Sequence, residues 1–157
     1  MLHITILAVG ETKDKRLADL SHEYLLRLSP YAKIQILSVK PEPFSSPSQK
    51  IKVKKKEAER LLAACPKDAL LILLHERGKS YTSLEFSTQL LSWSQNETKH
   101  LVFILGGPLG LDPDLLSKTP ALLSLSPLTF PHELAQTILL EQLYRAMTIL
   151  KCKTYHY

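Results

Sequence analysis

The sequence predicts an α/β fold in which a mostly parallel sheet carries helices on both faces. Compact apolar runs alternate along the chain with segments whose apolar residues recur at helical spacing, and this alternation is typical of such folds. Two of the runs, residues 70–74 and 101–105, contain no polar residue. Continuous apolar runs are expected where both faces of a strand are buried, so these two strands should lie in the middle of the sheet.

Five strands are expected from short apolar runs, each flanked by turn or polar residues. They occupy residues 2–9, 32–39, 69–74, 101–105 and 121–125. A first helix follows the first strand, because apolar side chains at i, i+3, i+7, i+8 and i+11 share one helix face. These side chains are Leu17, Leu20, Tyr24, Leu25 and Leu28. The longest helix should begin after Pro131 and run to about Leu150, with a broad apolar stripe.

Two further helices have recognisable start signals. Thr82 and Glu85 have the spacing of a capping box, in which each side chain satisfies a free backbone donor, and the helix should run to about Trp93. Asp112 followed by Pro113 is a second start, because Asp caps a helix and Pro is tolerated at the first helical position. That signal predicts a short helix.

One domain spanning residues 1–157 is the expected organisation. The chain is 45% hydrophobic, which supplies one sizeable core. Residues 40–48 contain three prolines and three serines, which is the composition of a mobile loop. No second core is evident on either side of this loop, so it is not predicted to be a domain linker.

Composition also bears on location and partners. No run of about 18 apolar residues is present and the first residues lack a signal-peptide pattern, so we expect a cytoplasmic protein without a membrane span. Cys65 and Cys152 are far apart in sequence and are expected to be free thiols. A formal net charge of +5 favours an anionic partner such as RNA.

Three strand ends are the candidate ligand sites, because ligands of open α/β sheets bind beyond the carboxyl ends of strands. Residues 106–110, Gly-Gly-Pro-Leu-Gly, follow one strand and form either a ligand loop or a tight turn. They match neither a G-x-G-x-x-G fingerprint nor a P-loop. Residues 125–132 offer a rigid wall for an adenine ring, or turn formers and a helix cap. Residues 74–79 could line the same crevice.

Charged residues give weaker signals. Glu141 and Arg145 are an i, i+4 pair, which alone indicates a surface ion pair. Cys152 and His156 are too few ligands for a closed zinc site, so no metal is expected. The densest positive run predicts either phosphate contact or the solvated start of an amphipathic helix. It comprises Lys50, Lys52, Lys54, Lys55 and Lys56.

The order of these motifs resembles the ribosomal large-subunit methyltransferase H family, a minimal group of SPOUT methyltransferases. The resemblance covers essentially the whole chain, and the length agrees. It is carried by LAVG at 7–10, GGPLG at 106–110, LSLSPLTFPH at 123–132, LYRA at 143–146 and Tyr155-His156.

The resemblance implies a carboxyl-terminal trefoil knot and a homodimer with its sites at the subunit interface. It also implies methyl transfer from S-adenosylmethionine to N3 of a pseudouridine in 23S rRNA, with the assembled ribosome as substrate. In the family, backbone groups of the knot loops hold the cofactor. By position these groups belong to Leu74, His75, Gly107, Ser126, Pro127, Leu128, Thr129, Phe130 and Pro131.

Catalytic candidates follow from the same resemblance. His156 is the candidate base or orienting group for the N3 proton, because an imidazole titrates near neutral pH. Tyr155 would stack on the nucleobase or hydrogen-bond to it. Arg145 would contact phosphate or the uracil edge, and His132 would shape the pocket.

Two departures from the family pattern bear on RNA binding. The chain ends in Tyr157 where the family has Arg, and Leu109 replaces a commonly acidic residue. Two other functions compete with this one. A noncatalytic RNA-binding or ribosome-associated module would need no cofactor pocket, and an unrelated nucleotide-binding enzyme would use the glycine turn for phosphates.

Overall fold

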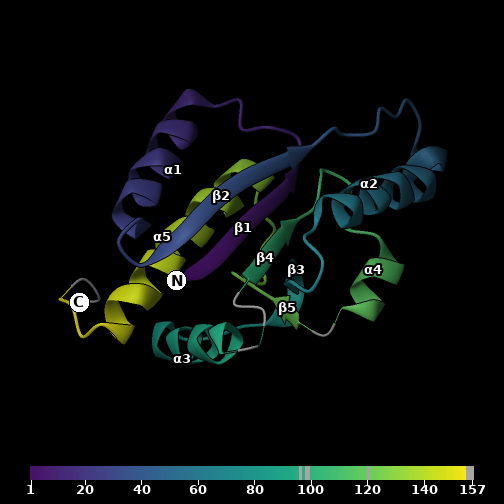
Figure 1. Ribbon diagram of the computed structural model, residues 1–157. Helices are drawn as coiled ribbons and strands as arrows, with labels where there is room; N and C mark the ends of the chain where they lie inside the picture. Colours follow the sequence, from purple (N-terminus) through teal and green to yellow (C-terminus); the bar gives the residue numbers. More distant parts are fainter. Residues whose placement is uncertain (96, 98–99, 120, 155–157) are drawn as a thin grey trace.

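Five parallel strands form one sheet in the computed structural model, in the order β2-β1-β4-β3-β5 (Figure 1). The structure describes residues 1–95, 97, 100–119 and 121–154. The strands are β1 Leu2–Val9, β2 Ala32–Val39, β3 Leu70–Lys79, β4 His100–Leu105 and β5 Ala121–Leu123. The helices are α1 Lys15–Leu28, the 3-10 turn η1 Pro47–Gln49, α2 Lys50–Ala64, α3 Ser83–Ser94, α4 Pro113–Lys118 and α5 His132–Leu150. The predicted α/β class is confirmed.

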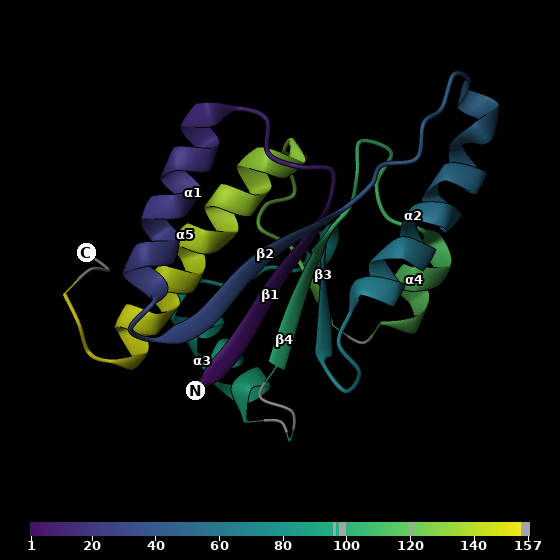
Figure 2. The ribbon, with the colours of Figure 1, turned by 45° about the horizontal axis from the view of Figure 1, so that its top comes forward.

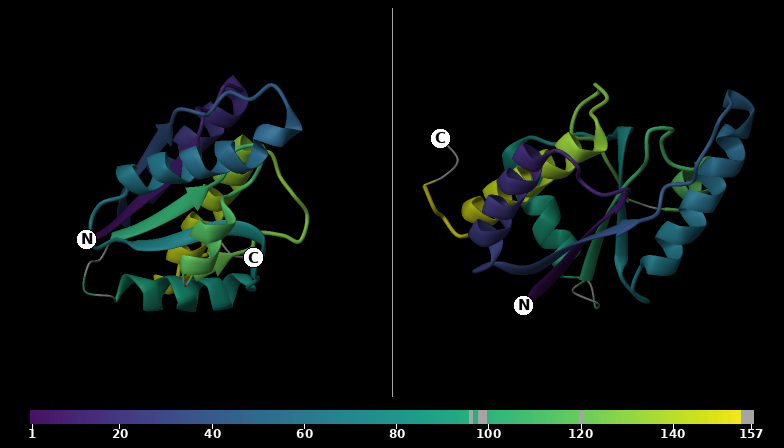
Figure 3. Two further views of the ribbon diagram at one scale, coloured as in Figure 1. Left: turned by 90° about the vertical axis from the view of Figure 1, so that its right-hand side faces the viewer. Right: turned by 90° about the horizontal axis from the view of Figure 1, so that it is seen from above.

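Helices cover both faces of the sheet, as the sequence predicts. Helices α1, α3 and α5 lie on one side, and α2 and α4 lie on the other (Figures 2 and 3). Each side has its own hydrophobic core. The core under α1, α3 and α5 includes Phe103, Leu139 and Leu143. The core under α2 and α4 includes Leu61 and Ile104.

Strand β1 lies between β2 and β4, and its side chains alternate between the two cores. Ile4 and Ile6 point to the three-helix face, whereas Leu7 and Val9 point to the α2/α4 face. The buried hydroxyl of Thr5 interrupts this apolar strand. It is paired with the ring of His100 at 2.9 Å and accepts from the Gln35 amide at 3.0 Å. This polar group is therefore satisfied within the core.

Both helix start signals are confirmed. The backbone N–H of Glu85 donates to the Thr82 hydroxyl at 3.3 Å, and the backbone N–H of Thr82 donates to the Glu85 carboxylate at 2.7 Å. This second bond is the main reason that the pKa of Glu85 lies below its usual value. The Asp112 carboxylate accepts from the backbone of residues 114 and 115, so α4 begins as predicted.

Strand β3 is longer than the run of apolar residues that predicts it. It continues through the polar residues 75–79, with an irregularity in its pairing to β5 between Leu74 and Lys79. Main-chain pairing maintains it there, since the Ser124 N–H donates to the Lys79 carbonyl at 3.0 Å. Such a main-chain hydrogen bond cannot be predicted from the apolar residues of the sequence. The last predicted strand is correspondingly shorter and ends at Leu123.

The two chain segments of that pairing pass very close together at Gly78. A Cβ added to Gly78 would lie 2.7 Å from the carbonyl carbon of Leu123 and 2.8 Å from that of Leu122. Only a residue without a side chain permits this backbone contact.

The threading of a trefoil knot remains an expectation from the SPOUT resemblance.

The proline-rich loop before α2 is held to that helix. Glu42 in the loop pairs with Lys56 at 2.7 Å and with Arg60, and its N–H donates to the Glu57 carboxylate at 3.0 Å.

In the described part of the chain, no helix is long and apolar enough to cross a membrane.

Candidate active site

A pocket of about 610 Å³ lies at the carboxyl ends of β3, β4 and β5, a volume within the usual range for small-molecule sites. Its walls come from all three strand ends that the sequence singles out. They are Leu74, His75, Glu76 and Arg77 from β3, residues 105–107 and 109–111 after β4, and Leu125, Ser126, Leu128, Thr129 and Phe130 after β5. The remaining lining residues are Lys50, Lys54, Pro113, Leu116 and Ala135.

The glycine loop after β4 is both a tight turn and a pocket wall. Gly110 has a φ of +81°, and its N–H donates to the Gly107 carbonyl at 2.9 Å. Gly107 packs closely from behind. A Cβ there would lie 3.1 Å from Oε2 of the buried Glu57 and 3.2 Å from Cγ1 of Val9. The tight turn is therefore confirmed, and the same loop lines the pocket in which the other interpretation would place a ligand.

The loop after β5 is shaped by two serines. The Ser124 hydroxyl lies 3.2 Å from the Glu76 carbonyl and 3.0 Å from the Ser126 carbonyl, and its single proton is shared between these two acceptors. The Ser126 hydroxyl accepts from the Leu128 N–H at 3.0 Å. Ser126 is thus a turn former, as one of the two interpretations holds, and it also lines the pocket. Leu128 follows at the pocket wall with 73% of its surface exposed.

His75 is fixed at the third wall. Its Nδ1 accepts from the Arg77 N–H at 3.1 Å, so Nδ1 carries no proton in this arrangement. Its Nε2 lies 3.9 Å from the Glu76 carboxylate. These contacts hold the ring at the edge of the pocket, with Nε2 on the side of Glu76.

Most of the predicted cofactor residues meet in this pocket, but not all. Pro127 lies between two lining residues without lining the pocket itself. Pro131 and His132 line a separate hollow together with Asp14 and Arg16. Nε2 of His132 is buried 3.9 Å from the point where a Cβ of Gly10 would stand, and it has no hydrogen-bond partner among the described residues. His132 therefore does not line the larger pocket.

Of the predicted catalytic residues, the structure describes only Arg145, which does not line the pocket. Arg145 pairs with Glu141 at 2.6 Å, and the two side chains are only 27% and 18% exposed, so the predicted pair is more enclosed than a surface pair. Ten residues separate Arg145 from the lining residue Ala135 on α5, which is about 15 Å along a helix. Tyr155 and His156 lie outside the described residues.

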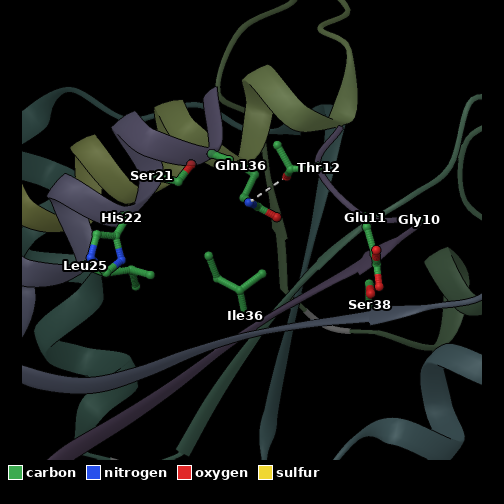
Figure 4. Close-up of a pocket in the computed structure, with 10 residues that line it drawn as sticks. Gly10, Glu11, Thr12, Ser21, His22, Leu25, Ile36, Ser38 and Gln136 are labelled. Atoms are coloured by element: carbon green, nitrogen blue, oxygen red, sulfur yellow. Dashed lines mark hydrogen bonds between the residues drawn. The ribbon is translucent and has the colours of Figure 1, made fainter. Parts of the chain in front are cut away.

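A second hollow, of about 380 Å³, lies at the ends of β1 and β2 beside α1 and α5 (Figure 4). Gln136 reaches into it from α5 and donates to the Thr12 hydroxyl at 3.2 Å. Gly10, the last residue of the LAVG motif, lines this hollow and not the larger pocket. The last residue of this motif therefore lies outside the larger pocket, whereas Val9 of the same motif packs behind Gly107.

The larger pocket suits a nucleoside-like cofactor. Leu105, Leu125 and Phe130 supply apolar surface for a ring, and the hydroxyls of Ser126 and Thr129 supply polar partners. The glycine loop brings backbone groups to the wall, which a side chain would keep away. In the part of the chain described, His, Cys, Asp and Glu side chains form no cluster of three that could hold a metal ion.

A family model described as "Predicted SPOUT methyltransferase" matches residues 2–156. The chain belongs to the SPOUT methyltransferase family.

Curated relatives narrow the family further. The chain is 42% identical to the ribosomal RNA large subunit methyltransferase H of Kosmotoga olearia, over 99% of this chain and 100% of that protein. It is 44% identical to the protein of the same name from Ruminiclostridium cellulolyticum, over 99% of both chains.

Solved structures with low sequence identity share the fold. One, described as a "probable methylase family protein" from Haemophilus influenzae, aligns with a TM-score of 0.54 at 15% identity. The alignment covers 95% of this chain and 66% of the other. Another, from a study of 2-OH methylation of C/U34 on tRNA, aligns with a TM-score of 0.50 at 14% identity, over 97% and 99% of the two chains.

Proposed function

We propose that this protein transfers a methyl group from S-adenosylmethionine to large-subunit rRNA, at N3 of a pseudouridine in 23S rRNA of the assembled ribosome. The observation that carries this proposal is the meeting of three separated strand ends in one pocket. Full-length identity above 40% to proteins named for large-subunit rRNA methylation supports the substrate class. We infer that the protein acts in the cytoplasm, where ribosomes are assembled.

The residues of the pocket would hold the cofactor and align it. S-adenosylmethionine supplies an activated methyl group on a sulfonium, and methyl transfer in line needs a fixed donor and a fixed acceptor. The rigid loops after β4 and β5, braced by the Gly107–Gly110 and Ser126–Leu128 hydrogen bonds, are suited to this task. In this proposal Leu74, His75, Gly107, Ser126, Leu128, Thr129 and Phe130 contact the cofactor, with Pro127 and Pro131 keeping the loop rigid.

The acceptor must lose a proton for the reaction to balance. As the N3–C bond forms and the sulfonium–methyl bond breaks, the N3–H proton has to be taken up by a base. We assign this role to His156, with Tyr155 beside the nucleobase. A neutral imidazole accepts one proton and returns it to solvent after release of the product.

We further propose that each site is shared between two subunits of a homodimer. Arg145 lies about 15 Å along α5 from the pocket of its own chain. In a homodimer, Arg145 of one subunit can serve the pocket of the other. A shared site would therefore account for the distance between Arg145 and the predicted cofactor residues of its own chain.

The first test is transfer of radiolabelled methyl groups to ribosomes from cells lacking the corresponding enzyme, followed by mapping of the labelled nucleotide. We expect label at N3 of a pseudouridine, and a large loss of label with His156→Ala. Calorimetry with S-adenosylmethionine runs in parallel. Cofactor binding without transfer to ribosomes would point to another RNA substrate, and absence of cofactor binding would establish the noncatalytic RNA-binding alternative.

A mixing experiment tests the shared site. Gly107→Val should displace the glycine loop and so disable the cofactor half of the site, because a Cβ at this position already meets Glu57 and Val9 behind the loop. Arg145→Gln should disable the other half. If sites are shared, unfolding and refolding the two inactive variants together restores one intact site per mixed dimer, or about a quarter of wild-type activity. If both halves belong to one chain, the mixture stays inactive.

A further inference from the structure

The fold divides the lysine run at the start of α2 into three groups. Lys56, together with Arg60, is paired with Glu42, and these bonds lower the pKa of the Glu42 carboxyl. Lys52 and Lys55 are exposed and line no pocket that the described residues form. Lys50 and Lys54 line the large pocket. The lysines of one sequence run therefore lie in three different environments in the structure.

Lys50 and Lys54 lie together because residues four apart share one face of a helix. That face is set by burial of Val53, Glu57 and Leu61, which fixes the rotation of α2 against the sheet. Lys54 is half-buried, and its Nζ lies 3.8 Å from the point where a Cβ of Gly110 would stand. The Lys54 ammonium group therefore stands at the glycine loop, and Lys50 lines the same pocket.

Within the described residues, neither Lys50 nor Lys54 makes an ion pair, in contrast to Lys56. The buried Glu57 carboxylate lines a small cavity together with Lys54, but it accepts a hydrogen bond from the Glu42 N–H. Arg77 adds a third cation to the pocket wall, and Glu76 is the carboxylate there. The wall thus carries an excess of positive charge, which attracts an anion to the pocket.

The charge of the cofactor does not account for this excess. S-adenosylmethionine carries a sulfonium, an ammonium and a carboxylate, and is a net cation, so a positive wall does not favour it as a whole. An RNA backbone is a polyanion, and lysine binds its phosphates as a point charge. RNA is therefore the partner that fits the charge of the wall.

We propose that Lys50 and Lys54 bind the RNA backbone at the pocket, on the phosphates next to the nucleotide to be methylated. This inference rests on the proposed function for the identity of the RNA. It assigns the pair a positioning role, since the lysines hold the strand and do not touch the reacting atoms. Lys52 and Lys55 have no part in it.

The test compares two double variants of equal charge in the full-length protein. Lys50→Gln with Lys54→Gln removes the pocket pair, and Lys52→Gln with Lys55→Gln is the matched control on the same helix. Binding to ribosomes from cells lacking the corresponding enzyme is measured at several KCl concentrations. Calorimetry gives the affinity of each variant for S-adenosylmethionine, and methyl transfer is measured alongside.

We expect the pocket variant to bind ribosomes roughly ten-fold more weakly, with the slope of log affinity against log salt reduced by about 1 to 2. Its cofactor affinity should stay the same or increase slightly, and the control should bind ribosomes like wild type. Equal losses in both variants would overturn the proposal in favour of a general basic surface. Weaker cofactor binding in the pocket variant would overturn it in favour of the cofactor carboxylate as the bound anion.

The binding measurement separates this proposal from the proposed function. If the wild-type protein binds ribosomes but transfers no methyl group, the proposed function fails, while the comparison of the two variants still decides the role of the lysine pair. If the wild-type protein shows no salt-dependent binding to ribosomes, the role of the lysine pair is refuted.

Discussion

The two faces of the sheet are built differently. The α1/α3/α5 face contains an aromatic cluster in which Trp93 packs against Tyr81, Phe86 and Phe103 with ring centroids 6.2–6.5 Å apart. The α2/α4 face has an aliphatic core with a smaller set of buried residues, and among its described members none is aromatic. The lysine-lined part of the pocket stands beside this second core.

The difference indicates that the two faces have different roles. Large apolar side chains on the three-helix face supply most of the burial that stabilises the fold. The α2/α4 face positions the glycine loop and the lysines, so its smaller core supports a site. Substitutions on the first face should therefore change stability, and substitutions at the edge of the second should change binding.

The sharpest comparison uses adjacent residues of β1 that point to opposite faces. Ile6 and Leu7 are both 0% exposed, and truncating such a side chain to Ala costs about 2–5 kcal/mol of unfolding free energy. We expect Ile6→Ala near the upper end, because the rigid three-helix core collapses poorly onto a cavity. Leu7→Ala should lie near the lower end. Urea unfolding measures both, and equal or reversed losses would contradict these different roles.

Gly78 tests the backbone contact that closes the pocket wall. Gly78→Ala places a methyl group 2.7–2.9 Å from main-chain atoms of Leu122 and Leu123, so one segment must move, at a cost of about 1–3 kcal/mol. Because Ser124 and Glu76 are joined beside this contact, cofactor affinity should fall as well. Calorimetry and thermal unfolding on one preparation check both effects. Weaker unfolding stability with unchanged cofactor affinity would show that the contact is only structural.

Thr82→Ala should affect stability alone. It removes the hydroxyl of the capping box at the start of α3, and loss of an N-cap typically costs about 1 kcal/mol. Helix α3 belongs to the three-helix face and contributes no residue to the pocket wall. Thermal unfolding should therefore shift while methyl transfer at a permissive temperature stays at the wild-type level. Thr82→Ser, which keeps a hydroxyl, is the control.

The smallest expected effect is on pH dependence at the start of α1. The Arg16 side chain and then its backbone N–H hydrogen-bond to Asp14 and lower the pKa of this carboxyl to about 2 from 3.8. Because folding lowers this pKa, the contribution of the ionised Asp14 carboxylate to folding stability is complete above pH 3.8 and is lost as the pH falls toward 2. NMR titration of the Asp14 carboxyl checks the value. Arg16→Gln should raise the pKa, though not fully to 3.8, because the backbone bond remains.

The sequence predicted the elements well because their signals are local. The alternating apolar runs, the Thr82 and Glu85 capping box and the Asp112 cap depend on residues a few positions apart. The extension of β3 to Lys79 was missed, because it depends on a main-chain bond to Ser124 that apolar content does not report. Of the pocket residues, Lys50 and Lys54 were not separated from their neighbours, although their spacing of four was visible.

The sequence by itself determined the α/β class, the order of the elements and the three strand ends that could bind a ligand. Only the tertiary structure decided which of these segments meet. It brought residues from β3, β4 and β5 into one pocket, left Pro131, His132 and Arg145 outside it, and gave the lysines of α2 three different surroundings. The physical reason is that side-chain periodicity is fixed by local backbone geometry, whereas proximity between distant segments depends on strand order and on the rotation of each packed helix.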